Sequence, residues 1–166
     1  MKSSEQPDGA DLKAELEKRI KGKIAIVGIG NILRADDGLG PKLIEILKTK
    51  PVKAALFDCG TVPENYIFPI LSSSSDTVIL VDAADLGAVP GQVKVFDIED
   101  IANVSFSTHN PSPRLFTDLL KTGREDLNIF VVSVQPKSTM LGGPFSTEVL
   151  NGLDMLADAL LNIAGQ

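Results

Sequence analysis

The residues of this chain that are best suited to chemistry are a few acidic side chains and one histidine, scattered along the sequence. Asp36 and Asp37 stand side by side in the loop 28–40, Asp82 follows an apolar run of five residues, and His109 is the only histidine. Carboxylate oxygens and an imidazole nitrogen suit a divalent first-row metal ion, although they select weakly among nickel, zinc and their neighbours. A metal site is therefore one interpretation.

Each of these residues also has a purely structural interpretation. Asp36 or Asp37 could cap a helix N-terminus, where free N–H groups and the helix dipole favour a carboxylate. Asp82 could be a turn aspartate that accepts hydrogen bonds from nearby N–H groups. A single histidine such as His109 could serve only the packing of its loop. The residue types alone leave these alternatives open.

Two further kinds of chemistry can be weighed from the sequence. Cys59 with His109 as its base would make a cysteine hydrolase, but the neighbouring Asp58 raises a thiol pKa rather than lowering it. Asp58 could support a site or simply end its strand. A serine triad is disfavoured because the sequence contains no Gly-x-Ser-x-Gly.

A nucleotide-binding module is another alternative, because Gly28-x-Gly30 begins like a dinucleotide-binding loop. The third glycine of that fingerprint is replaced by Leu33. Asp37 would also occupy the helix end that a phosphate requires. The loop therefore favours a cation over an anion.

Hydrophobic periodicity predicts the elements that must position these side chains. Apolar runs indicate strands at 23–27, 52–57, 77–81 and 128–134, and an alternating run indicates an antiparallel edge strand at 92–96. Amphipathic patterns indicate helices at 11–21, 38–48, 64–71, 113–121 and 147–163, whereas 98–106 is ambiguous. Strands that alternate with helices predict a three-layer α/β fold, with a mostly parallel twisted sheet of about five strands and helices on both faces.

Ligands of such folds bind beyond the carboxyl ends of the strands. Asp36 and Asp37 follow the first strand, Asp58 ends the second, Asp82 ends the third, and His109 precedes the next helix. All five side chains are expected at one edge of the sheet. The helix at 113–121 is expected to be capped by Ser112 and to turn inward the residues Leu115, Phe116, Leu119 and Leu120.

Composition limits the partners of the chain. Its 166 residues suit one domain at 11–166 after a flexible segment at 1–10, and we expect a monomer. The formal net charge of −6 and the lack of a basic run disfavour nucleic acid and anionic membranes as partners. No apolar run approaches the roughly 20 residues of a membrane span. One cysteine excludes an internal disulfide, and the chain is expected to be cytoplasmic.

The motifs of this sequence resemble those of the nickel–iron hydrogenase maturation proteases, in the branch that serves formate-hydrogenlyase-type hydrogenases. The motifs are Gly28-Ile29-Gly30-Asn31-Ile32-Leu33-Arg34-Ala35-Asp36-Asp37-Gly38-Leu39-Gly40, Asp58-Cys59-Gly60-Thr61, Val81-Asp82-Ala83-Ala84-Asp85, Ser107-Thr108-His109-Asn110 and Val134-Gln135-Pro136. Cys59 stands where the family has a glycine, and the helix at 11–21 precedes the family's usual start.

The resemblance implies an endopeptidase that removes the C-terminal extension of a hydrogenase large-subunit precursor. It implies that Asp37, Asp82 and His109 are the catalytic residues and bind nickel, with Asp36 and Asp58 in support. The nickel is expected to arrive with the precursor, so that the isolated protein can be free of metal. A small-molecule or nucleotide-binding module without protease activity remains the alternative.

Overall fold

The computed structural model describes residues 8–106 and 113–165. Most of the predicted flexible segment at 1–10, the predicted ligand His109 and the predicted cap Ser112 lie outside the described residues.

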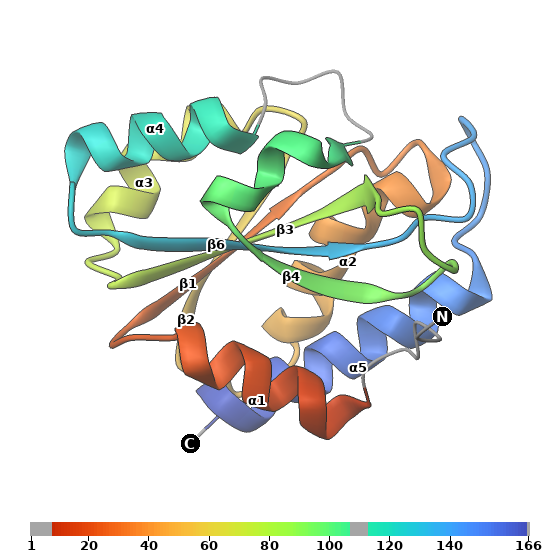
Figure 1. Cartoon of the computed structure of the whole chain (residues 1–166), viewed down its shortest axis with the longest axis horizontal. Helices are drawn as coiled ribbons and strands as arrows, with labels where there is room; N and C mark the ends of the chain where they lie inside the picture. The colour runs from red at the N-terminus through yellow and green to blue at the C-terminus, as the bar shows by residue number, and fades with distance from the viewer. Residues whose placement is uncertain (1–7, 107–112, 166) are drawn as a thin grey trace.

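The centre of the fold is a six-stranded sheet (Figure 1). Its strands are β1 (Ile24–Ile29), β2 (Ala54–Gly60), β3 (Thr77–Asp85), β4 (Val93–Asp97), β5 (Ser105–Phe106) and β6 (Asn128–Val134). The order is β2-β1-β3-β6-β4, and β5 pairs with β3 off this path. Strands β2, β1, β3 and β6 are parallel, whereas β4 is antiparallel to β6 at the sheet edge, as predicted.

Helices cover both faces of the sheet, which confirms the predicted three-layer α/β architecture. One face packs against α1 (Gly9–Arg19), α2 (Leu39–Lys48) and α5 (Thr147–Ala164). The other packs against α3 (Ile67–Ser72), α4 (Pro113–Gly123) and the 3₁₀ helix η3 (Ile98–Asn103). Two further 3₁₀ helices are η1 (Ala35–Gly38) and η2 (Pro63–Tyr66).

The predicted inner face of α4 is partly wrong. Phe116 and Leu120 are buried as expected, but Leu115 is 50% exposed and Leu119 is 44% exposed. Thr117 takes the buried position between them, because its hydroxyl donates to the Arg114 carbonyl oxygen at 2.7 Å and so satisfies its own polar atom. The helix is therefore rotated toward Thr117 relative to the prediction.

Strand β3 is longer than predicted, and Asp82 does not end it. Pairing of β3 with β1 stops at Val81, opposite Gly28. The strand continues because β6 pairs with it as far as Ala83 and because the short β5 pairs with its last two residues. Asp82 is thus the first residue of β3 that does not pair with β1, and it lies at the carboxyl edge of the sheet.

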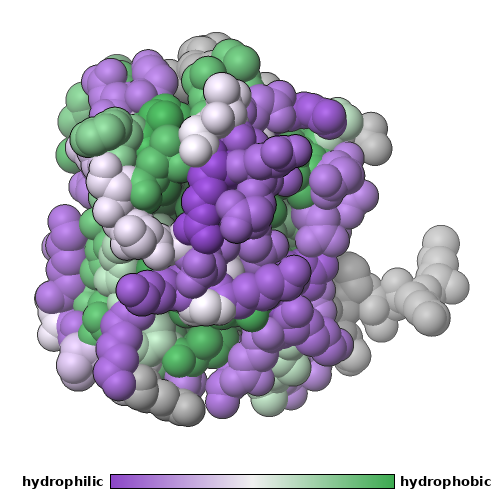
Figure 2. Space-filling view, turned by 90° about the vertical axis from the view of Figure 1, so that its left-hand side faces the viewer, coloured by the Kyte–Doolittle hydropathy of each residue, from purple (hydrophilic) through white to green (hydrophobic). Residues whose placement is uncertain are grey.

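The opposite edge of the sheet, where the parallel strands begin, faces the viewer in Figure 2 and is largely hydrophilic over its centre. Arg124 forms ion pairs there with Asp76 at 2.9 Å and Asp126 at 3.1 Å. Exposed ion pairs of this kind contribute little to stability and indicate a solvated surface. Within 8–106 and 113–165, no helix combines the length and the apolar character needed to cross a bilayer.

Candidate active site

The connection from β1 to α2 carries the first two acidic residues. Gly28 and Gly40 lie against each other where strand and helix touch, and a Cβ on either would overlap backbone atoms of the other element. Gly30 has φ +148°, and a Cβ there would overlap the Asp37 carbonyl oxygen. These glycines therefore bring strand, loop and helix into close contact, which explains the Gly-x-Gly pattern without a nucleotide.

Ala35 begins η1 in a left-handed backbone conformation, with φ +46°. A residue with a Cβ rarely adopts this conformation, which costs about 1–2 kcal/mol. Asp36 and Asp37 follow this strained residue, and both are buried. Backbone strain next to two buried acids is typical of a functional site.

Asp36 is a completely satisfied carboxylate. Its oxygens accept hydrogen bonds from the backbone N–H groups of Lys137, Ser138 and Ser146 at 2.9, 3.0 and 2.7 Å, and from the Ser146 hydroxyl at 2.8 Å. Burial by itself would raise the pKa of Asp36, but the donors from Ser146, Ser138 and Lys137 together hold that pKa below its ordinary value. Asp36 thus ties the loop before α5 to η1.

Asp36 does not cap a helix, so that structural interpretation was wrong for it. The cap positions of η1 and α2 are Arg34 and Gly38, and neither forms a side-chain capping bond. Its hydrogen bonds instead hold the loop 137–146 next to η1, which also contains Asp37.

Asp37 and Asp82 form a buried pair of carboxylates. Their side chains are about as buried as the core, with residue exposures of 1% and 2%. One Asp37 oxygen accepts the Asn31 N–H at 3.3 Å, and Asp82 accepts the backbone N–H of Ala83. Within residues 8–106 and 113–165, Oδ1 of Asp82 has no hydrogen-bond partner. Burial first, and then the charge of Asp37, raise the pKa of Asp82 well above its ordinary value. A cation between the two carboxylates would relieve this cost, so the pair fits a metal ion.

Ser133 is a candidate site residue that the sequence reasoning missed. It pairs in register with Asp82, so both side chains project from the same face of neighbouring strands. Its hydroxyl is fully buried and, like Oδ1 of Asp82, has no hydrogen-bond partner among the described residues. Two adjacent unsatisfied polar atoms are uncommon in a folded protein and indicate a place for a ligand.

The third predicted ligand, His109, lies outside the described residues. The part of the chain that the structure describes contains no cluster of three His, Cys, Asp or Glu side chains able to hold a metal. Strand β5 ends at Phe106, which pairs with Ala84, two residues beyond Asp82. Phe106, the last described residue before position 113, therefore lies close to Asp82 along β3.

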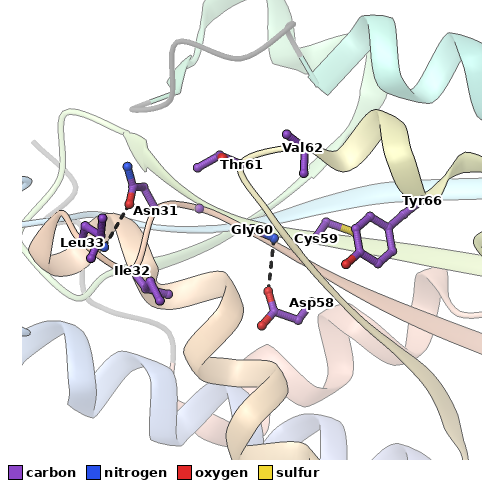
Figure 3. Close-up of a pocket in the computed structure, with 10 residues that line it drawn as sticks. Asn31, Ile32, Leu33, Asp58, Cys59, Gly60, Thr61, Val62 and Tyr66 are labelled. Atoms are coloured by element: carbon purple, nitrogen blue, oxygen red, sulfur yellow. Dashed lines mark hydrogen bonds between the residues drawn. The ribbon is translucent and has the colours of Figure 1, made fainter.

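Asp58 and Cys59 are directed to opposite faces of the sheet. The exposed Asp58 carboxylate accepts the Gly60 N–H at 3.1 Å and lies toward α2, away from Cys59 (Figure 3). Cys59 is only 1% exposed and belongs to the core on the α3–α4 face. Burial, followed by the charge of Asp58, raises the pKa of the Cys59 thiol to about 12. Such a thiol stays protonated at neutral pH, which makes it a poor nucleophile.

Comparison with known protein families identifies one matching family over most of the chain. Residues 41–163 match the family described as HycI, hydrogenase maturation protease. Hydrogenase 3 maturation protease of Escherichia coli is 34% identical over 111 residues, which cover 65% of this chain and 69% of that protein. Coenzyme F420 hydrogenase subunit delta of Methanothermobacter thermautotrophicus is 30% identical over 121 residues, or 69% and 75% of the two chains.

Solved structures give the same result. The [NiFe] hydrogenase maturation protease HycI from Thermococcus kodakarensis superposes with a TM-score of 0.82 at 29% identity, over 92% of this chain and 99% of that one. The endopeptidase HycI from Escherichia coli superposes with a TM-score of 0.76 at 28% identity, over 84% and 90% of the two chains.

Proposed function

We propose, from the premise that the chain belongs to the hydrogenase maturation protease family, that it removes the C-terminal extension of a nickel-loaded hydrogenase large-subunit precursor. It is an endopeptidase of hydrogenase large-subunit precursors. The match to the HycI family supports the formate-hydrogenlyase-type branch. We further propose that it acts as a monomer in the cytoplasm.

We propose that the nickel of the precursor is recognised by Asp37, Asp82 and His109. The observation that carries this proposal is the buried pair of Asp37 and Asp82, whose unsatisfied oxygen and like charges suit a cation. His109 follows Phe106 by three residues, and three residues of extended chain span at most about 11 Å. Because Phe106 pairs with Ala84, this span starts close to Asp82.

Recognition of this kind gives each residue a separate task. When bound, the nickel would polarise the scissile carbonyl or activate a water molecule. Asp37 and Asp82 would orient the precursor by holding its metal, and their burial would keep bulk water away from the ion. Asp36 would keep the loop 137–146 in place around them through its four hydrogen bonds. Asp58 would act only in support.

The test compares nickel-loaded and nickel-free precursor, each incubated with the purified protein, and follows release of the C-terminal extension. We expect cleavage of the loaded precursor alone, and no cleavage of either by Asp37→Ala. Equal cleavage of the two precursors would show that the protein does not recognise nickel.

The nucleotide-binding alternative is not favoured by the family match. The glycines of the loop are occupied in strand–helix packing, and Asp37 lies buried beside the start of α2. The cysteine hydrolase interpretation is likewise weakened by the burial of Cys59 and by its high pKa.

A further inference from the structure

A surface cavity of about 530 Å³ lies beside the candidate active site and has no assigned role. The β1–α2 loop forms one wall with Asn31, Ile32 and Leu33, and the segment after β2 forms the other with Thr61, Val62 and Tyr66 (Figure 3). Its volume falls within the range of roughly 300–1,000 Å³ that is usual for ligand pockets. The cavity is therefore large enough to receive part of a substrate.

The lining of this pocket is mainly apolar. Ile32, Leu33 and Val62 at its rim are 70%, 64% and 42% exposed, which is unusual for neighbouring aliphatic side chains unless they meet a partner. The Asp58 carboxylate also borders the pocket, but it is bound to the Gly60 N–H and lies toward α2. An apolar group would thus be favoured inside, and an anionic one would lose its hydration and meet the Asp58 carboxylate.

The pocket is directly connected to the carboxylate pair. The backbone N–H of Asn31, in the pocket wall, donates to the Asp37 carboxylate. The Asn31 side-chain oxygen accepts the Leu33 N–H at 2.9 Å, and Figure 3 shows its amide nitrogen turned away from Leu33. That nitrogen donates to no described residue and is free to bind a peptide carbonyl. A peptide bound here would pass next to Asp37.

We propose that this pocket binds one apolar side chain of the precursor close to the scissile bond, and that it sets the cleavage specificity. The inference rests on the proposed function, because it takes the precursor as the occupant. Binding of the side chain would fix the peptide along the Asp37 loop. The nickel, held by Asp37 and Asp82, would fix the part of the precursor that carries it. Two attachment points of this kind would limit which peptide bond of the precursor can reach the metal.

The experiment fills the pocket with Val62→Trp and uses Val89→Trp as the matched control. Val89 is also an exposed valine in a loop, at 55% exposure, and it does not line the pocket. Val62→Glu adds a charge at the same rim as a second variant. KM and kcat for cleavage of the nickel-loaded precursor, precursor binding and the melting temperature are measured for each protein.

We expect both Val62 variants to raise KM about tenfold, the loss usual for a mismatched apolar pocket, with kcat and melting temperature close to those of Val89→Trp. Apolar residues flanking the scissile bond of the precursor are also replaced by alanine, one at a time. One replacement should raise the KM of the wild-type protein about tenfold and raise that of Val62→Trp much less, because both changes remove the same contact.

The outcomes separate this inference from the proposed function. Cleavage by the wild-type protein with equal KM for Val62→Trp and Val89→Trp would overturn the pocket and leave the protease function standing. Precursor binding that Val62→Trp weakens, without any cleavage by the wild-type protein, would support the pocket and overturn the function. Absence of both binding and cleavage would overturn both.

Discussion

Two acidic regions of this molecule lie next to each other and have opposite character. Asp36 has four hydrogen-bond donors, and they lower its pKa. The pair Asp37 and Asp82 is equally buried, yet Oδ1 of Asp82 finds no partner in the described part of the chain, and the pKa of Asp82 is raised. Burial is thus compensated at Asp36 by the chain itself, whereas one oxygen of Asp82 is left without a donor from the described residues.

The difference shows how one turn of chain can separate structural and functional roles. Asp36 and Asp37 are adjacent in η1, so their side chains point in different directions from the same strained backbone. One carboxylate binds the loop 137–146, and the other is the one that we propose to meet the nickel of the precursor. Stability and function are therefore expected to respond in opposite ways to substitution at the two positions.

The strongest test of this comparison is a matched pair of isosteric variants, Asp36→Asn and Asp82→Asn. Asp36→Asn sets an amide against N–H donors and is expected to cost about 3 kcal/mol, or roughly 9 °C in melting temperature for a chain of this size. Asp82→Asn removes a buried acid whose raised pKa destabilises the fold, and it is expected to gain about 1 kcal/mol, while cleavage is lost. Calorimetry of the metal-free proteins measures both. Shifts of the same sign would contradict the contrast.

The pH dependence of stability provides a second test. The pKa of Asp36 is lowered from 3.8, so its stabilising contribution is present above pH 3.8 and is lost as pH falls toward the folded-state pKa. The pKa of Asp82 is raised above 3.8, so this group destabilises the fold at pH values above 3.8, and the penalty shrinks as pH falls through the raised value to 3.8.

Melting temperatures of the wild type and the two asparagine variants between pH 7 and pH 3 measure these contributions. The advantage of Asp82→Asn over the wild type should shrink on acidification across the interval above pH 3.8, whereas the disadvantage of Asp36→Asn should persist there. An advantage of Asp82→Asn that is constant with pH would mean that Asp82 is not the titrating group.

The smallest expected effect concerns Ser133, the neighbour of Asp82. If the Ser133 hydroxyl bonds to Asp82 or to the ion once metal is bound, Ser133→Ala is expected to weaken Ni²⁺ binding about tenfold, without lowering the melting temperature of the metal-free protein. Ser75→Ala is the matched control, because Ser75 is also a buried serine but bonds to the Ser73 hydroxyl at 2.8 Å. Titration calorimetry with Ni²⁺ measures both, and equal affinities would remove Ser133 from the site.

Much of the fold could be predicted because burial leaves a periodic pattern. The continuous apolar run of β6 gave both of its ends correctly, at Asn128 and Val134. The length of β3 could not be predicted, since its last residues are held by pairing with β5 and β6, which are distant in sequence. The face of α4 was missed at Leu115 and Leu119, because Thr117 can satisfy its hydroxyl within the helix.

The candidate site was predictable only in part. Asp37 and Asp82 could be found because acidic residues after apolar strands meet at one edge of a parallel sheet. The role of Asp36 could not, since its partners lie 101 to 110 residues further along the chain. Ser133 could not either, because one serine within an apolar strand has no distinctive pattern. The sequence locates charges, whereas their hydrogen bonds depend on the folded structure.

The bonds between Asp36 and the loop 137–146 also affect the order of events during synthesis. The ribosome delivers η1 and β3 early, but the donors for Asp36 and the neighbour of Asp82 in β6 emerge only with the final third of the chain. A nascent or stalled polypeptide that lacks these residues cannot assemble the candidate active site. The candidate site can therefore form only after residues 133–146 have been synthesised.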